Sequence, residues 1–365
     1  MSIGSPKAGN IDNIQVMRGV AASLVVLFHC LLVALEPRCH RYQLCREAVT
    51  FGASGVDMFF VISGFIMMYT SRAAFGSAGA AADFLVRRAI RIIPLYWLLT
   101  TLFIGLMLLR KLDISTTHVV FSYLFLPEST SHGGTRPVLA QGWTLSYEWY
   151  FYLVFAIWMA LGSRQALAKF GWLVFLLIGA LAGFTVRSET ARTFLQDGIV
   201  LEFCLGMALA VMYEKGIRMG GRTPAIMVAG GMATLFAAAH GLAFMQSNIR
   251  WLLLGVPAAC ALWGMINLRV PAGICLTSLL FLGDASYSIY LSHLIVTLTM
   301  SHYVARMQLN VAMSGLVLLL GVSACIAVGS LIYITVERPM NHWLRRIHST
   351  YRNRASPLAS ERIPS

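Results

Sequence analysis

Charged residues are scarce in this chain. Asp, Glu, Lys and Arg together make up 12% of the 365 residues, and 58% of the residues are hydrophobic. Soluble domains are about 25% charged and about 45 to 50% apolar. The mean hydropathy is +0.72. This composition excludes an ordinary soluble domain and predicts an integral membrane protein.

No cleavable leader, internal repeat or linker is expected in this chain. The first apolar run, residues 14–35, is about 20 residues long and has no small-residue cleavage site, so it predicts a retained span. We therefore expect one transmembrane domain over residues 14–336. A short N-terminal tail, residues 1–13, precedes it, and a basic C-terminal tail, residues 337–365, follows it.

Ten runs of about 17 to 25 apolar residues are long enough to cross a bilayer as helices. They are residues 14–35, 52–70, 89–109, 142–161, 170–186, 198–213, 224–244, 251–268, 276–300 and 311–336. The predicted fold class is an all-α, polytopic membrane protein with about ten transmembrane helices. Residues 118–126 are too short to cross and are predicted to be re-entrant or interfacial.

Lys and Arg residues indicate the orientation. They are more frequent in the loops that lie inside when the N-terminus is inside, which predicts that both termini are cytoplasmic. The net charge of +13 does not indicate a nucleic-acid partner, because the cations are scattered over short loops and one tail. In this orientation Cys39 and Cys45 lie outside, where a disulfide and two free thiols are equal alternatives.

Ionisable residues inside a span are costly and are functional candidates by default. Arg18 and His29 are 11 residues apart in the first span, which places them on one helix face about 16 Å apart along the axis. This pattern favours a shared polar path. The alternative is an arginine that binds lipid phosphate and a structural histidine.

Four ionisable residues share one estimated depth. His29, Asp57, Glu148 and His293 each lie roughly 8 to 11 Å below the outer end of their span at the helical rise of about 1.5 Å per residue. We expect one polar layer that contains two imidazoles and two carboxylates. The alternative is a set of separate structural pairs.

Two further groups of residues are candidates for binding. Arg87, Arg88 and Arg91 begin the third span, where guanidinium groups suit phosphate but equally serve as a positive-inside anchor. Three aromatic residues of the fourth span are candidates for stacking on sugar rings, although interface anchoring is the commoner role of such residues. They are Trp143, Tyr147 and Tyr150.

Five ordered segments, followed by VERP at residues 336–339, resemble the bacterial acyltransferase 3 family. They are IDNIQVMRGVAASLVVLFH (residues 11–29), GASGVDMFFVISGF (52–65), FLVRRAIRIIPLYW (84–97), GWTLSYEWYFY (142–152) and FLGDASYSIYLSH (281–293). The likeness covers nearly the whole chain. Within the family the chain is most similar to the exopolysaccharide-production O-acetyltransferases.

The resemblance implies an enzyme of the bacterial inner membrane. Such enzymes transfer an acyl group, usually acetyl from cytoplasmic acetyl-CoA, to a hydroxyl of a polysaccharide or its lipid-linked precursor. The family's essential Arg and His map to Arg18 and His29, and its arginine pair for the acyl donor maps to Arg88 and Arg91. No metal is expected.

These residues suggest a mechanism. A sugar hydroxyl needs a positioned base, and histidine is the usual one, so we assign this role to His29. Glu148 or Asp57 is expected to orient its ring, and Arg18 to contact the pantetheine arm or the thioester oxygen. His293 is expected near the substrate and is the next candidate base. An acyl-histidine relay is a variant that the residues leave open.

Two other functions compete with the enzyme. In a transporter or flippase of a polysaccharide intermediate, the same buried charges form a proton path, but the internal repeat of many transporters is missing. A non-catalytic scaffold leaves the buried charges unexplained. Thioester turnover without an ion gradient separates an enzyme from a transporter.

Overall fold

The computed structural model describes residues 9–39, 51–128, 136–238, 249–269, 273–307 and 310–355. Within these ranges the chain is almost entirely helical and contains no strand. Cys45 and the side chain of Cys39 lie outside the described residues, so their pairing stays a prediction.

Helices make up most of the described chain. They are α1 (Gly9–Cys39), η1 (Gly52–Ser54), α3 (Gly55–Thr70), α4 (Ala78–Leu109), α5 (Thr116–Tyr123), α6 (Gly142–Leu161), α7 (Arg164–Thr185), α8 (Glu189–Gln196), α9 (Val200–Glu214), α10 (Thr223–Ala238), η3 (Trp251–Gly255), α11 (Val256–Asn267), α12 (Ile274–Val304), α13 (Val311–Ile332), η4 (Tyr333–Glu337) and α14 (Arg338–Ala355). Seven helical segments of the described chain are long and apolar enough to cross a membrane. The all-α polytopic class is therefore confirmed, whereas the count of ten is not.

Each predicted span coincides with a helix, but several boundaries differ. α4 begins at Ala78, eleven residues before the predicted start, because Ser77 caps it by accepting a bond from the Ala80 amide. The helical segment Trp251–Asn267, formed by η3 and α11, nearly matches the span expected over residues 251–268, and α10 is described as far as Ala238. α5 has only eight residues, as expected for a segment too short to cross.

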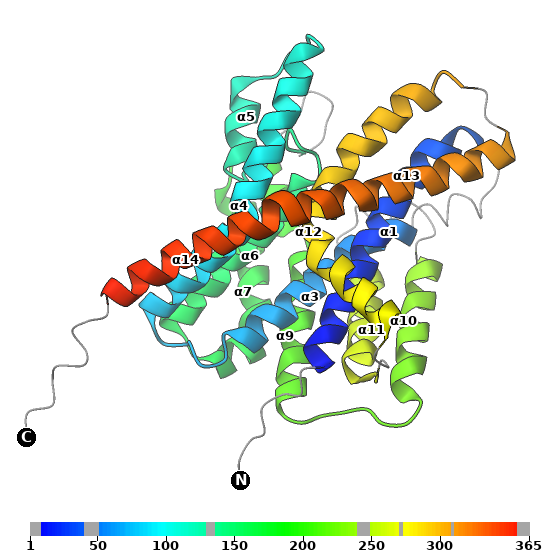
Figure 1. Ribbon diagram of the computed structural model, residues 1–365. Coiled ribbons are helices and arrows are strands. Elements are labelled where there is room, and N and C mark those ends of the chain that lie inside the picture. The colour runs from blue at the N-terminus through cyan, green and yellow to red at the C-terminus, as the bar shows by residue number, and fades with distance from the viewer. Residues whose placement is uncertain are drawn as a thin grey trace, which may run out of the picture.

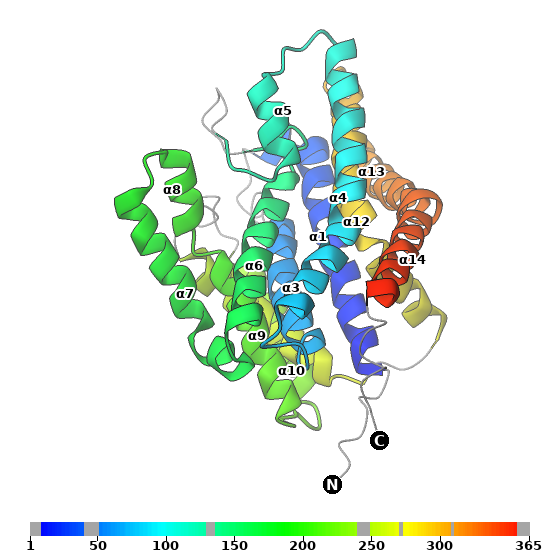
Figure 2. The ribbon, with the colours of Figure 1, turned by 90° about the vertical axis from the view of Figure 1, so that its left-hand side faces the viewer.

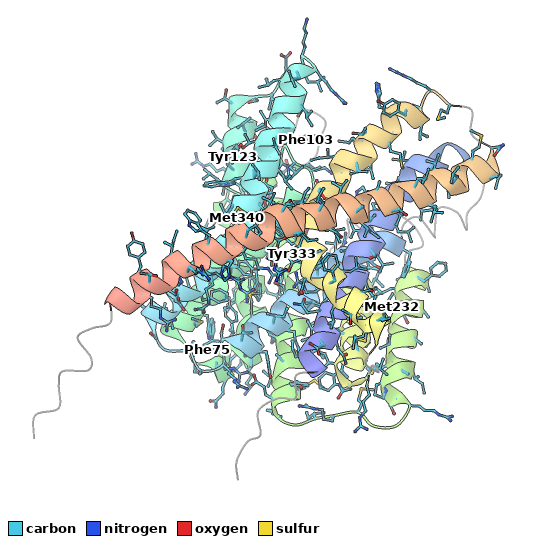
Figure 3. The ribbon with its side chains drawn as sticks, viewed as in Figure 1. Phe75, Phe103, Tyr123, Met232, Tyr333 and Met340 are labelled. Carbon is cyan, nitrogen blue, oxygen red and sulfur yellow. The ribbon has the colours of Figure 1, made fainter. Side chains whose placement is uncertain are left out.

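The C-terminal part differs more. We expected the last span to end at Val336 and a tail to follow, but the π-helical turn η4 joins α13 directly to α14. The result is one long helix that runs across one side of the bundle (Figure 1). Tyr333 and Met340 lie on the stretch that crosses the bundle (Figure 3), and the Tyr333 ring packs 5.9 Å from the ring of Phe281 in α12.

The centre of the bundle is formed by α1, α3, α9 and α12. Figure 2 shows α1 and α3 enclosed between α6 and α7 on one side and α12 to α14 on the other. Met58, Phe65, Phe151 and Phe203 are among the fully buried side chains of this core.

Two pairs of helices pack with their backbones in close approach. A Cβ atom on Gly64 of α3 would collide with the Phe203 carbonyl of α9, and one on Gly283 of α12 would collide with the Gln15 carbonyl of α1. Glycine is required at both crossings, as is usual where membrane helices pack tightly. The second crossing fixes α12 against the first turns of α1, three residues before Arg18.

Candidate functional site

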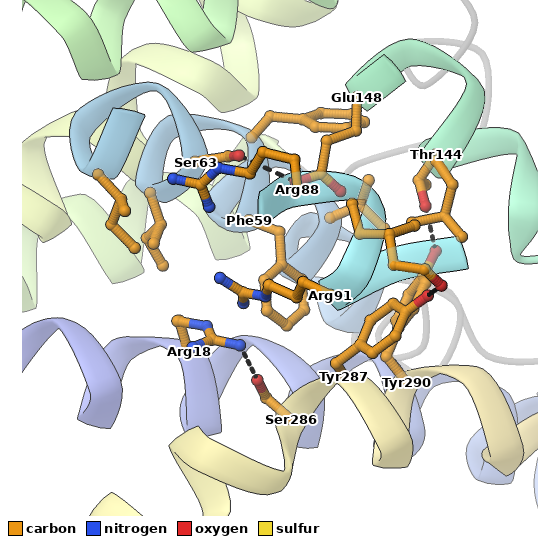
Figure 4. A pocket seen from close by; sticks show the side chains of 16 residues that line it. Arg18, Phe59, Ser63, Arg88, Arg91, Thr144, Glu148, Ser286, Tyr287 and Tyr290 are labelled. Atoms are coloured by element: carbon orange, nitrogen blue, oxygen red, sulfur yellow. Dashed lines mark hydrogen bonds between the residues drawn. The ribbon is translucent and has the colours of Figure 1, made fainter. Parts of the chain in front are cut away.

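A cleft of about 700 Å³, which includes its open mouth, lies among α1, α3, α4, α6 and α12. Figure 4 shows the side chains that line it. Its charged lining residues are Arg18, Arg88, Arg91 and Glu148. Three guanidinium groups thus face one carboxylate, so the cleft carries an excess of positive charge and suits an anionic ligand.

Arg18 is held at the wall of the cleft by α12. One of its terminal nitrogens donates to Ser286 Oγ at 2.8 Å, and the other donates to Gln15 Oε1 at 2.7 Å. Only 8% of Arg18 is exposed. Its guanidinium therefore points toward the N-terminal part of α1 and away from His29, which lies about 16 Å further along the helix.

Arg88 and Arg91 enter the cleft from α4. The guanidinium of Arg88 lies over the rings of Phe84 and Tyr152, at 5.5 and 5.7 Å from their centroids, and this cation–π contact fixes its position. The side chain of Arg91 lies beside that of Arg18 (Figure 4). The structure thus brings Arg18 of the first predicted span together with Arg88 and Arg91 of the third.

Arg87 does not belong to this group. It forms an ion pair with Asp83 one turn earlier on α4, and its side chain is 49% exposed. Because Arg87 lies about 100° around the helix from Arg88, it faces α14 instead of the cleft. The prediction that Arg87 binds the same ligand is not supported by this geometry.

His29 contacts His293 of α12. The His293 Nε2 atom lies 3.2 Å from His29 Nδ1, and the ring centroids are 4.7 Å apart. His293 is fully buried, whereas His29 is only partly buried. The two imidazoles of the predicted polar layer therefore form a pair.

Backbone carbonyl groups determine the tautomers of this pair. His293 Nδ1 lies 2.6 Å from the Tyr290 carbonyl and His29 Nδ1 lies 2.9 Å from the Val25 carbonyl. A carbonyl oxygen only accepts, so in each neutral ring Nδ1 carries the hydrogen. His29 Nδ1–H then faces the lone pair of His293 Nε2, and His29 Nε2 keeps its own lone pair, as a general base requires.

Glu148 and Asp57 do not take the position expected for them. Glu148 lines the cleft, where it accepts hydrogen bonds from Ser63 at 3.0 Å and from Tyr152. Asp57 is fully buried and binds Arg250 with both carboxylate oxygens, at 2.8 and 2.9 Å. Neither carboxylate is bonded to the His29 ring, so the prediction that one of them orients it is wrong, and His293 takes that place.

The aromatic residues proposed for sugar stacking also lie elsewhere. Tyr147 donates to Asp197 at 2.8 Å and stacks on Phe194 at 4.3 Å. Tyr150 packs on Phe175 and Phe194, and Trp143 packs on Tyr147. These three residues are 4 and 3 positions apart, so they share the face of α6 that is turned toward α7 and α8 and away from the cleft.

Three lining residues of α12 were missed at the sequence level. Ser286 binds Arg18, Tyr287 donates to the Ile92 carbonyl at 2.7 Å, and Tyr290 lies 2.8 Å from Thr144 Oγ1. The signal was present, because Ser286, Tyr290 and His293 follow the spacing i, i+4, i+7 that aligns residues on one helix face.

Two buried carboxylates were also missed. Glu202 of α9 is fully buried near Asp57 and Arg250, and Glu337 of η4 is 5% exposed and accepts from Ser288 at 2.5 Å. An ionisable residue inside an apolar run is itself a signal, and Glu202 lies in the run 198–213, whereas Glu337 directly follows the run 311–336. Among the described residues no group of three or more side chains has the composition of a metal site.

The arrangement combines a cationic cleft with a histidine pair that has a free lone pair. The Tyr290 side chain lines the cleft, and its carbonyl holds His293. Such a site can hold a phosphorylated ligand at its arginines and take a proton from a hydroxyl at His29.

The family model described as an acyltransferase domain, of the acyltransferase 3 type, matches residues 11–334. The chain belongs to the acyltransferase 3 family. The resemblance seen in the five sequence segments is thereby confirmed, and with it the assignment to multi-pass membrane acyltransferases.

Two curated members of the family are similar over most of their length. The exopolysaccharide production protein ExoZ of Rhizobium meliloti (strain 1021) is 34% identical over 320 residues, which cover 82% of this chain and 93% of the relative. The acyltransferase MdmB of Streptomyces mycarofaciens is 25% identical over 335 residues, which cover 81% of this chain and 83% of the relative. No solved structure matches the chain significantly.

Proposed function

We propose that this acyltransferase transfers an acetyl group from acetyl-CoA to a hydroxyl of an exopolysaccharide, another surface glycan or its lipid-linked precursor. The observation that carries the proposal is the pair of sites on α1. Arg18 lies in the cationic cleft and His29 lies about 16 Å further along the same helix, in a family of acyltransferases. The printed name of the first relative, an exopolysaccharide production protein, supports a glycan as the acceptor.

The charge of the cleft supports a coenzyme A donor. Coenzyme A carries its phosphates at one end and the thioester at the other end of a long flexible arm. Guanidinium groups bind phosphate through paired, charge-assisted hydrogen bonds, so Arg88 and Arg91 are assigned to the phosphate end. Arg18 points away from His29, so we assign it to the phosphates or the arm and not to the thioester oxygen.

The histidine pair is assigned to proton transfer. His29 Nε2 accepts the proton of the acceptor hydroxyl while the oxygen attacks the thioester carbonyl carbon. A carbon–oxygen bond forms, the carbon–sulfur bond breaks, and the leaving thiolate takes the proton from His29. His293 Nε2 accepts a hydrogen bond from His29 Nδ1–H. This bond stabilises the His29 imidazolium between proton uptake and proton release, as the carboxylate does in a catalytic triad.

The bacterial inner membrane is the proposed location, with both termini in the cytoplasm. This orientation places the start of α4, and with it the arginines, on the side where acetyl-CoA is available. The lipid bilayer and the glycan are the expected partners.

Purified protein provides the test. In detergent, without any ion gradient, it should consume [¹⁴C]acetyl-CoA and label an isolated glycan acceptor. Hydrolysis or transfer that depends on acceptor supports the proposal. Glycan binding without thioester turnover would contradict it and would favour a transporter of a polysaccharide intermediate.

A further inference from the structure

The last turns of α14 are anchored on the second turn of α4. Asp83 of α4 lies 3.3 Å from His348 Nε2 and 3.3 Å from an Arg352 nitrogen, and it also pairs with Arg87 of its own helix. Figure 1 shows the end of α14 beside the start of α4. One carboxylate therefore holds cationic residues from both helices.

This anchor sets the register of the two helices. Arg88 lies five residues after Asp83, about 7.5 Å along α4. Arg345 lies on the α14 face of His348 and Arg352, since it is three and seven residues away from them. Along α14, Arg345 lies about 4.5 Å before His348 and about 10.5 Å before Arg352. The two helices run antiparallel, so Arg345 and Arg88 lie at about the same height above the Asp83 anchor. The charges of Arg345 and Arg88 accordingly interact.

Arg345 differs from the other cations at the contact of α14 with α4 in having no ion pair within the described chain. Arg87 and Arg352 share Asp83, whereas none of the ion pairs between described side chains involves Arg345. Its side chain is exposed, Arg88 is partly buried, and Arg18 is 8% exposed. We describe Arg345, Arg88, Arg91 and Arg18 as a row, because exposure falls along it and the charges of successive members interact. The last three line the cleft.

We propose that Arg345 is the outermost residue of the donor site and binds the 3′-phosphate of the nucleotide end of acetyl-CoA. This inference rests on the proposed function. The thioester must reach into the bundle, so the nucleotide lies at the exposed end of the row. There a phosphate monoester, the group of highest charge on the donor, meets a guanidinium that has no carboxylate of its own.

The chain offers a matched control in Arg346. It carries the same charge on the same helix, and it is exposed, but it lies about 100° around the helix from Arg345 and away from α4. Binding would be measured by calorimetry on the full chain in lipid-free detergent, with acetyl-CoA and 3′-dephospho-acetyl-CoA. Size-exclusion chromatography would confirm that each variant is folded.

Arg345→Ala should weaken binding of acetyl-CoA about tenfold, the equivalent of one charge-assisted hydrogen bond, and leave the dephospho donor almost unchanged. Arg346→Ala should change neither. Equal losses with both donors, or equal losses in both variants, would overturn the assignment. The assignment would also be overturned if Arg345→Ala weakened acetyl-CoA binding only after anionic lipid is added to the detergent. Arg345 would then bind a lipid headgroup and not the donor.

The proposed function has its own readout in the same series. Arg88→Ala should weaken both donors, since Arg88 lies deeper in the cleft. If Arg88→Ala binds both donors as the wild type does, the donor site itself is misplaced. If Arg88→Ala weakens both and Arg345→Ala weakens neither, only the role of Arg345 is refuted.

Discussion

Two sets of buried ionisable groups occupy this bundle, and they differ in how their charges are compensated. In the cleft, three arginines and one carboxylate line the wall. In the second set, Asp57 and Arg250 close on each other through two hydrogen bonds, with the Asp57 side chain fully buried. The first set retains the capacity to bind a ligand, whereas the charges of Asp57 and Arg250 already satisfy each other. A buried charge therefore indicates a site only when its partner is missing from the protein.

The largest expected effect tests the histidine pair that accompanies the cleft. His29→Ala should lower acyl transfer roughly 10² to 10⁴-fold, as is typical when a general base is lost, while acetyl-CoA still binds. His29→Gln should not restore activity, because an amide cannot take the proton. Radiolabelled transfer per amount of folded protein is the measurement. Turnover near the wild-type rate in His29→Ala would refute the base assignment and make His293 the next candidate.

The second prediction concerns the closed pair. Arg250→Met leaves Asp57 as a buried carboxylate without its cation, which should cost about 3 to 5 kcal/mol of stability. The double variant Arg250→Met, Asp57→Leu should recover most of this loss, because the carboxylate that Arg250 binds is removed together with its cation. Thermal unfolding in detergent measures both. Normal stability combined with loss of acyl transfer in Arg250→Met would instead place this pair in the reaction.

A third prediction separates neighbouring arginines of α4. Arg91→Lys should weaken acetyl-CoA binding about tenfold, since an ammonium cannot reproduce the two parallel bonds of a guanidinium. Arg87→Ala is the control and should bind the donor normally, because Arg87 is paired with Asp83 outside the cleft. Titration calorimetry gives both constants. Equal weakening in the two variants would mean that the local positive charge matters and the cleft geometry does not.

The smallest expected effect lies on the far face of α6. Tyr147→Phe removes the hydrogen bond to Asp197 and should lower stability by about 1 kcal/mol. The apparent affinity for the glycan acceptor should not change, because Tyr147 packs against Phe194 and does not line the cleft. Initial rates at varied acceptor concentration check this. A raised KM for the acceptor would restore the sugar-stacking role.

Sequence reasoning was sufficient for the features that depend on one helix at a time. Apolar runs located the long apolar helices, since crossing a bilayer sets a minimum length and excludes most charge. Helical periodicity placed Arg18 and His29 on one face of α1, and five motifs identified the family, which the match over residues 11–334 confirms. The π-helical join that extends α13 into α14 gave no such signal, because nothing in the hydropathy of residues 333–337 distinguishes a continued helix from a tail.

Partner choice between helices depended on tertiary structure alone. Depth along a span correctly predicted that His29 lies level with His293. It also grouped Asp57 and Glu148 with them. In the structure, however, Asp57 binds Arg250, and Glu148 binds Ser63 and Tyr152. A residue's position in a span specifies its height but not the direction in which it points relative to other helices. That direction is decided where backbones meet, as at Gly283 against Gln15 and Gly64 against Phe203, because only one rotation of each helix permits such close approach.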